Sequence, residues 1–106
     1  MAQRKLVRRP TAQRDLAEAV RYLRKESGVA TSHRFLDEVE TTVTRLLSFP
    51  NLGTPWPTTR RELIGVRRRL IPHFPYSVFY LPSEERIELV RVLHNSRDIP
   101  ALLEAR

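Results

Sequence analysis

The side chains best suited to chemistry are one histidine and several arginines. His94 is preceded by Arg91 and followed by Arg97, and residues 67–69 are three consecutive arginines. A histidine can give or take a proton near neutral pH, and a guanidinium can bind a phosphate through two parallel hydrogen bonds. Metal-independent cleavage of RNA needs such groups: a base for the 2′-hydroxyl, an acid for the leaving oxygen and cations over the phosphate.

The residues near the end of the chain also have a structural interpretation. A histidine at the end of an interior strand is often held by hydrogen bonds, and Arg97 with Asp98 can form an ion pair or cap a terminal helix. Because side chains alternate along a strand, Arg91 and His94 should point to opposite faces unless a bulge intervenes. A bulge or twist would therefore be needed to bring them together.

The central arginines and a nearby tyrosine are open to two interpretations as well. Arg67, Arg68 and Arg69 can form a solvated strand edge that deters pairing between sheets, or they can contact phosphate or a protein partner. Tyr76 suits a sheet face or a core, and stacking on a base is the alternative. The residue types alone do not decide between structure and binding.

Composition narrows the class of protein. The chain has 106 residues and a formal net charge of +7, which favours a polyanion or an acidic protein as partner. It has no cysteine, and no histidine stands with carboxylates at a metal-ligand spacing, so we predict no metal and no cofactor. Without a long apolar run we expect no membrane span, a cytoplasmic location, and a single domain over residues 1–106.

Apolar periodicity predicts a helix pair and then strands. In residues 11–26 and 30–49 the apolar positions recur at steps of three and four, and the short link at Ser27 and Gly28 predicts an antiparallel helix hairpin. A period of two predicts strands over residues 63–71, 76–81 and 86–94, the last of them apolar on both faces like an interior strand.

The remaining segments complete an α+β fold of the order βααβββ with a short C-terminal helix. Residues 5–8 resemble an edge strand, prolines mark residues 50–61 as a loop, and a last helix is predicted over residues 99–105. We expect an antiparallel sheet of about four strands with the helix hairpin on one face. The opposite face, with Arg67 and Arg69, is then expected to be open to a partner.

Short motifs along almost the whole chain occur in a specific order and spacing. They are Pro10, Ala12, Asp15, Leu16, Tyr22, Leu23, Phe35, Leu46, Pro50, Asn51, Leu52, Gly53, Gly65, Val66, Arg67, Phe74, Pro75, Tyr76, Phe79, Tyr80, Arg91, Val92, Leu93, His94, Arg97 and Asp98. In these residues the sequence resembles the RelE/ParE superfamily of toxins, and most closely its ParE, plasmid-stabilisation branch.

The resemblance implies the toxin of a type II toxin-antitoxin system, neutralised by a cognate antitoxin in a hetero-oligomer. It also implies two classes of target, DNA gyrase and messenger RNA on the ribosome. An endoribonuclease would use His94, Arg97 and Arg91 for catalysis, whereas a gyrase inhibitor needs only a binding surface. The nuclease branch usually has a basic residue in the strand that reads 76–80 here, and this stretch has none, which favours gyrase.

The same resemblance, together with the basic composition, suggests a binding surface. Arg67, Arg68, Arg69 and Tyr76 are the residues that we expect to contact the target or the antitoxin.

Overall fold

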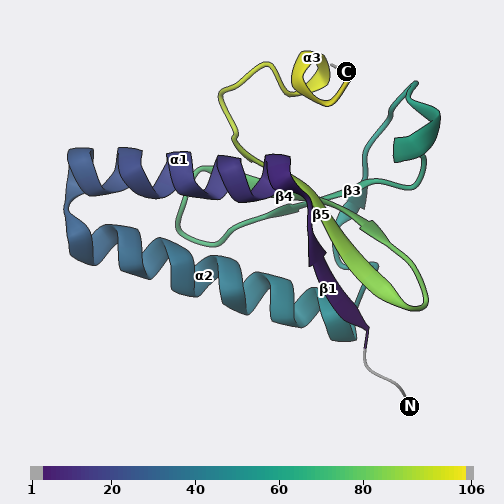
Figure 1. The fold of residues 1–106 in the computed structure, drawn as a ribbon, viewed down its shortest axis with the longest axis horizontal. Coiled ribbons are helices and arrows are strands. Elements are labelled where there is room, and N and C mark those ends of the chain that lie inside the picture. The colour runs from purple at the N-terminus through teal and green to yellow at the C-terminus, as the bar shows by residue number, and fades with distance from the viewer. Residues whose placement is uncertain (1–3, 105–106) are drawn as a thin grey trace.

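The computed structural model describes residues 4–104, and its main elements follow the predicted order (Figure 1). They are β1 (Lys5–Arg8), α1 (Pro10–Ser27), α2 (Val29–Ser48), β2 (Thr54–Pro55), the 3-10 helix η1 (Arg61–Leu63), β3 (Arg67–Leu70), β4 (Tyr76–Pro82), β5 (Arg86–His94) and α3 (Ile99–Glu104). β2 lies within residues 50–61, which were predicted as a loop, and η1 lies where this loop was expected to lead into a strand at residue 63. The observed strand, β3, begins only at Arg67. Ala105, predicted as the last helical residue, lies outside the described residues.

Two residues determine where the helix hairpin begins and turns. Arg9 is extended, and Pro10 follows it as the first residue of α1, where its missing N–H costs no helical hydrogen bond. Gly28 has φ +93°, a value that glycine adopts without steric cost, and its N–H donates to the carbonyl of Arg24 over 3.0 Å. The single residue ends α1 and starts α2, so the two helices run antiparallel as predicted.

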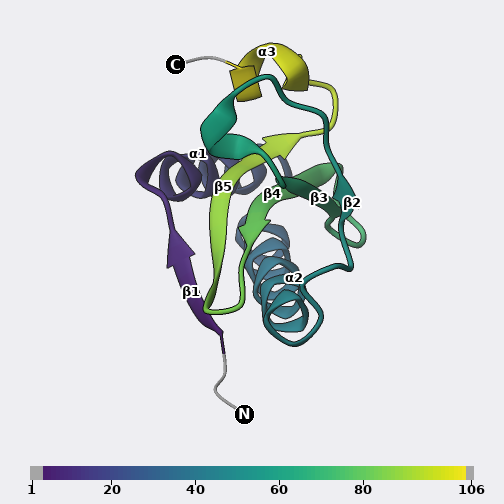
Figure 2. The same ribbon diagram turned by 90° about the vertical axis from the view of Figure 1, so that its right-hand side faces the viewer.

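The sheet has five strands in the order β1-β5-β4-β3-β2 (Figure 2). β4 runs antiparallel to β3 and to β5, as predicted, but β1 pairs with β5 in parallel. The prediction of an all-antiparallel sheet of about four strands was therefore wrong in these two details. The short segment 5–8, apolar in the middle, predicts that a strand exists, but it carries no information on the direction of its partner.

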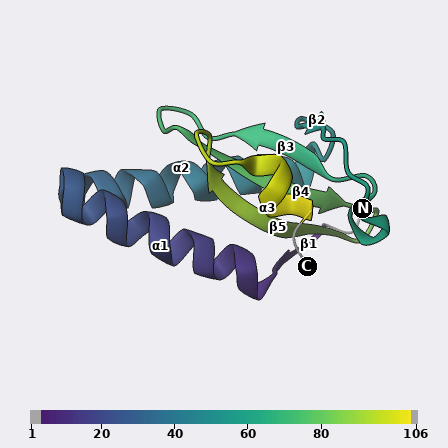
Figure 3. The same cartoon turned by 90° about the horizontal axis from the view of Figure 1, so that it is seen from above.

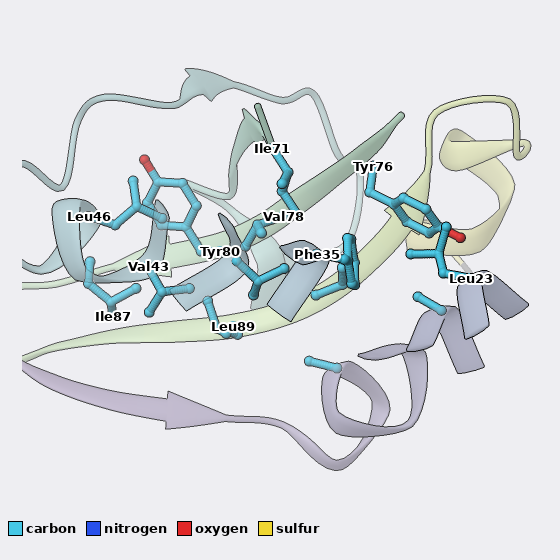
Figure 4. Packing of buried hydrophobic residues seen from close by; sticks show 14 residues of the cluster. Leu23, Phe35, Val43, Leu46, Ile71, Tyr76, Val78, Tyr80, Ile87 and Leu89 are labelled. Carbon is cyan, nitrogen blue, oxygen red and sulfur yellow. The ribbon is translucent and has the colours of Figure 1, made fainter. Parts of the chain in front are cut away.

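The larger hydrophobic core lies between the helix hairpin and one face of the sheet (Figure 4). Val78 and Tyr80 of β4 and Leu89 of β5 are fully buried against the inward sides of α1 and α2. Phe35 of α2 packs edge-on against Phe74 with 5.3 Å between the ring centroids. The hairpin is therefore attached to one face of the sheet, as predicted.

A second core covers the opposite face. Phe79 and Val90 point to this side and are buried under η1, α3 and the Trp56 ring. Figure 3 shows α3 on the side of the sheet away from α1 and α2. The prediction that this face is open to a partner is wrong, because a C-terminal helix and a long loop supply the apolar cover that no second helix pair provides.

The C-terminal helix is fastened to that loop by its last described residue. The carboxylate of Glu104 accepts hydrogen bonds from the Thr58 hydroxyl at 2.6 Å, the Thr59 amide at 3.1 Å and the Thr59 hydroxyl. These bonds, led by that of Thr58, hold the pKa of Glu104 below its usual value. Within residues 4–104 no helix has the length and apolar character needed to cross a bilayer.

Candidate functional site

Two of the three consecutive arginines turn toward the loop after α2. Arg67 and Arg69 pair across β3–β4 with Tyr80 and Val78, whose side chains face the helix hairpin. The Arg67 guanidinium donates to the carbonyl of Gly53, and Arg69 donates to the carbonyl of Leu52 at 3.4 Å. Both side chains are half-buried. Their hydrogen bonds to these carbonyls hold the loop 50–55 against the edge of the sheet.

Arg68 lies on the other face, within the second core. Its Nε donates to the Ser77 hydroxyl at 2.9 Å and its Nη2 to the Asn95 amide oxygen at 3.1 Å. The guanidinium carbon stands 5.3 Å from the centre of the Trp56 ring, in cation–π distance. Arg68 is thus packed against the second core and bound by its polar groups, and it is not an exposed cation.

Arg91 is held by a carboxylate from α1. Its Nε and Nη2 donate to the two oxygens of Asp15 at 2.7 and 3.0 Å, and the Val92 amide donates to the same carboxylate at 3.0 Å. The bond to Asp15 raises the pKa of Arg91 above its usual value. Asp15 is 9% exposed, so this bidentate pair joins α1 to β5 from inside the protein.

The pairing of β4 with β5 shifts register next to Arg91. Phe79 lies opposite Arg91 and Tyr80 lies opposite Leu89, so Val90 is the extra residue of a bulge. The bulge precedes Arg91, and His94 lies opposite Tyr76, so alternation between Arg91 and His94 persists. Arg91 binds Asp15, and His94 lines a pocket beside α1. Asp15 lines the same pocket but Arg91 does not, so the side chains of Arg91 and His94 do not meet there.

His94 lies in a pocket of about 410 Å³ between α1 and the ends of β4 and β5. Its Nδ1 accepts the Ser96 amide N–H at 3.1 Å and lies 2.8 Å from the Ser96 hydroxyl. In the neutral ring the proton then sits on Nε2. The Tyr76 ring packs edge-on at 5.0 Å, and Tyr76 is 6% exposed, so burial raises the pKa of its hydroxyl.

The same pocket contains further polar side chains. It is lined by Asp15, Glu18, Ala19, Tyr22, Tyr76, Val92, Leu93, His94, Ser96 and Arg97. Of the residues predicted from the sequence, His94, Arg97 and Tyr76 are therefore brought together, whereas residues 67–69 lie elsewhere on the sheet. Among residues 4–104 no group of three histidine, aspartate or glutamate side chains is placed to hold a metal ion.

Comparison with known protein families decides the identity of this fold. A model of the family described as "ParE toxin of type II toxin-antitoxin system, parDE" matches residues 6–99. The chain belongs to the ParE toxin family. It is thus the toxin component of a type II toxin-antitoxin system, with an antitoxin as its partner protein.

One solved structure supports the same fold for this ParE toxin. A chain from "Chromosomal ParDE TA system from P. aeruginosa" is 18% identical, with 87% of this chain and 96% of that chain covered and a TM-score of 0.70. The "YoeB dimer from Staphylococcus aureus" is 18% identical over 85% of this chain and 94% of its own, with a TM-score of 0.45. No curated protein sequence matches the toxin.

Sequence reasoning did not place Asp15 and Tyr22 among the site residues of this ParE toxin, although both belong to the family motif and line the pocket. A signal for Asp15 was present: it lies in the row of buried α1 positions with Ala12, Ala19 and Leu23. A carboxylate in such a row requires a buried hydrogen-bonding partner. Its partner, Arg91, lies 76 residues away, so the pair itself was not visible in the sequence.

Two other motif residues of the ParE toxin act together. The Gly53 amide donates to the Tyr80 hydroxyl at 2.9 Å, and that hydroxyl donates to the carbonyl of Pro50 at 2.7 Å. A Cβ on Gly53 would stand 2.7 Å from the same hydroxyl. The Pro50 to Gly53 motif is therefore needed to close the loop over Tyr80, and burial raises the pKa of this tyrosine.

Proposed function

We propose that this ParE toxin acts in the cytoplasm as an inhibitor of DNA gyrase and has no catalytic turnover of its own. One observation carries the proposal: Arg91, one of the cations that a ribonuclease reaction would place on the phosphate, is held by both oxygens of the nearly buried Asp15. A guanidinium bound in this way cannot turn to a substrate without leaving a buried carboxylate unpaired.

Strand β4, the last but one in the chain, adds support. β4 is buried from Tyr76 to Tyr80 and has no basic residue there, and the three arginines of β3 are bound to loop carbonyls and core groups. An inhibitor that binds gyrase requires an accessible surface but no assembled acid, base and cations. The chain belongs to the ParE family, the branch that its sequence most closely resembles, and gyrase is one of the two classes of target that this resemblance implies.

The test is a supercoiling assay with purified gyrase and relaxed plasmid. We expect the toxin to block supercoiling and to increase the amount of linear, cleaved plasmid, and the purified antitoxin to reverse both effects. A His94→Ala variant should inhibit as strongly as the wild type, since no proton transfer is involved. Undiminished supercoiling at a large molar excess of folded toxin would contradict the proposal.

Ribosome-dependent cleavage of messenger RNA is the second candidate, and one observation favours it. His94 and Arg97 line the same pocket as Glu18 and Tyr76, which places a proton-transfer group, a cation and an aromatic ring together. We expect codon-phased 5′ ends of transcripts after induction if this candidate is correct, and His94→Ala or Arg97→Ala should abolish them. Intact transcripts during growth arrest would exclude it.

A further inference from the structure

The cations of this protein fall into two groups, those bound within the fold and those without a partner. Side chains such as Arg9, Arg67, Arg68 and Arg91 are paired with carboxylates, carbonyls or hydroxyls. Within the described residues 4–104, the exposed side chains without such a partner on α1 are Arg14, Arg21, Arg24 and Lys25. Six other exposed cations within residues 4–104 also lack such a partner and are spread over β1, α2, η1, β5 and the segment after it: Lys5, Arg8, Arg45, Arg61, Arg86 and Arg97. The largest group on a single element is therefore the one on α1.

These four residues, named here the α1 basic stripe, share the outward side of α1. Arg14, Arg21 and Lys25 are separated by seven and four residues, which places them in one row along a helix, and Arg24 lies beside that row. At 1.5 Å per residue, the stripe covers about 16 Å of helix length. The buried positions Ala12, Asp15, Ala19 and Leu23 lie on the opposite side.

The shape of the molecule leaves this side accessible to a large partner. The second half of α1 and the turn to α2 project beyond the strands in two perpendicular views (Figures 1 and 3). One carboxylate, Glu18, lies in the same row, between Arg14 and Arg21. It also lines the His94 pocket and interacts electrostatically with Arg91. The stripe thus presents four cations against one neighbouring anion.

Helix stability does not explain the stripe as a whole. Cations in the last turn are favourable at the negative end of the helix dipole, which accounts for Arg24 and Lys25. Arg14, in the second turn, gains nothing from the dipole, and α1 has no acidic residue in its first turn. An ion pair between neighbouring turns would also stabilise the helix, but none of the four side chains forms one within residues 4–104.

We propose that the α1 basic stripe binds the phosphate backbone of duplex DNA. The choice of DNA rests on the proposed function, since DNA is the substrate that gyrase holds. A DNA strand carries one phosphate per 3.4 Å of helix axis, so the length of the stripe matches about four to five successive phosphates. Arginine binds a phosphate with two parallel hydrogen bonds, and the lysine acts as a point charge.

The composition of the stripe favours a nucleic acid over a protein partner. Stable protein interfaces have an apolar core inside a polar rim. Between Arg14 and Arg21 the outward row contains Ala17 and Glu18 and no large apolar side chain. Farther along α1, all of which the structure describes, Tyr22 is the only large apolar side chain that is exposed, and a single ring does not make an apolar core. Contacts to a phosphate backbone need no apolar core, because the release of condensed counterions supplies most of the affinity.

The test measures binding of the purified toxin to a fluorescent 20-base-pair duplex of arbitrary sequence at increasing salt, without gyrase. Four phosphate contacts predict a slope of log affinity against log salt of about −3.6. The stripe variant, Arg14→Gln with Arg21→Gln and Arg24→Gln, should reduce this slope to about −0.9.

A control variant removes the same charge elsewhere. It combines Arg45→Gln, Arg61→Gln and Arg86→Gln, three exposed arginines on α2, η1 and β5. We expect it to keep the slope of the wild type. Lysine in place of the three stripe arginines should also keep the slope, which separates loss of contacts from loss of folding.

Three results would overturn the inference. An equal reduction by the stripe and control variants would mean that net charge alone drives binding, and an unchanged slope in the stripe variant would place the DNA elsewhere. Weaker binding of the stripe variant to polyglutamate, with DNA binding unchanged, would make the stripe a protein-binding surface.

The supercoiling assay separates this inference from the proposed function. A toxin that inhibits gyrase but whose stripe variant binds DNA like the wild type refutes the inference alone. A toxin that binds DNA through the stripe but leaves gyrase active refutes the proposed function alone.

Discussion

The bidentate pair between Asp15 and Arg91 should be one of the largest single contributions of polar groups to the stability of this toxin. An Asp15→Ala variant removes the acceptor of three hydrogen bonds, two from Arg91 and one from the Val92 amide. It leaves a partly buried guanidinium and a buried amide N–H without a partner. Glu18, an exposed carboxylate on the same helix, forms no hydrogen bond of this kind within the described residues and therefore serves as a comparison.

The magnitude follows from the burial of the two partners. Breaking a fully buried ion pair costs about 3–5 kcal/mol. The Arg91 side chain is 22% exposed and recovers part of its hydration, so we expect a loss of about 3 kcal/mol in the free energy of unfolding. For a domain of this size that corresponds to a fall of roughly 12–15 °C in Tm.

The assay is urea denaturation of the purified toxin, followed by far-UV circular dichroism. Asp15→Asn keeps an oxygen for the Val92 amide but loses the charge, so it should cost about half as much as Asp15→Ala. Glu18→Ala, the matched control, removes the same charge from an exposed position one turn away and should change the free energy by less than about 0.5 kcal/mol.

A double-mutant cycle assigns the loss to the pair. Arg91→Leu combined with Asp15→Ala should cost about 2 kcal/mol less than the sum of the single variants, because neither then leaves a charge unpaired. If Asp15→Ala and Glu18→Ala were equally stable, or if the two losses were additive, the pair would not join α1 to β5 as described.

Three further predictions concern the loop and the C-terminal helix. Gly53→Ala places a methyl group 2.7 Å from the Tyr80 hydroxyl and 2.8 Å from a backbone carbonyl, so it should lower the free energy of unfolding by about 2–3 kcal/mol in urea. Tyr80→Phe leaves the Gly53 amide and the Pro50 carbonyl without their partner and should cost about 2 kcal/mol in the same assay. Because its bonded neighbours lower the pKa of Glu104, this residue stabilises the fold above its unfolded pKa of about 4.3, and this contribution disappears as the pH falls through the lower folded pKa. Glu104→Gln should therefore reduce the loss of stability on acidification, as measured by Tm from pH 6 to pH 2.5.

Each of these has a result that contradicts it. A Gly53→Ala variant as stable as the wild type would mean that the loop does not close over Tyr80. A Tyr80→Phe variant that unfolds at the urea concentration of the wild type would leave its hydroxyl without a structural role. Parallel Tm curves for the wild type and Glu104→Gln would show that the carboxylate does not fasten α3.

The local elements of this protein were well predicted from its sequence. Both helices, the turn at Gly28 and the spans of β1, β4 and β5 agree with the structure to within one or two residues. The period of two predicted for β4 is also observed, since Tyr76 and Tyr80 lie in the larger core and Phe79 lies in the second core. Periodicity succeeds here because a burial pattern records which side of each element faces a core.

The partner of each strand and the coverage of each face were harder to predict. The parallel pairing of β1 joins Lys5 to Arg86, and the second core joins Leu63 to Leu103. Such contacts connect residues that are far apart in the sequence, and period and propensity describe only neighbours. The short α3 and the irregular segment before β3 carry too little periodicity to reveal that they cover a sheet face.

What the sequence determined alone is the set of elements, the inward side of each and the family motif; what only the tertiary structure decided is which charged groups remain free. From the sequence we interpreted the three arginines at 67–69 as a cationic surface. In the structure they are bound to carbonyls, a hydroxyl and an aromatic ring. Arg14 and Arg21 read as an ordinary polar helix face but have no partner within residues 4–104. A charge is visible in a sequence, whereas its neutralisation depends on groups that folding brings within hydrogen-bond distance.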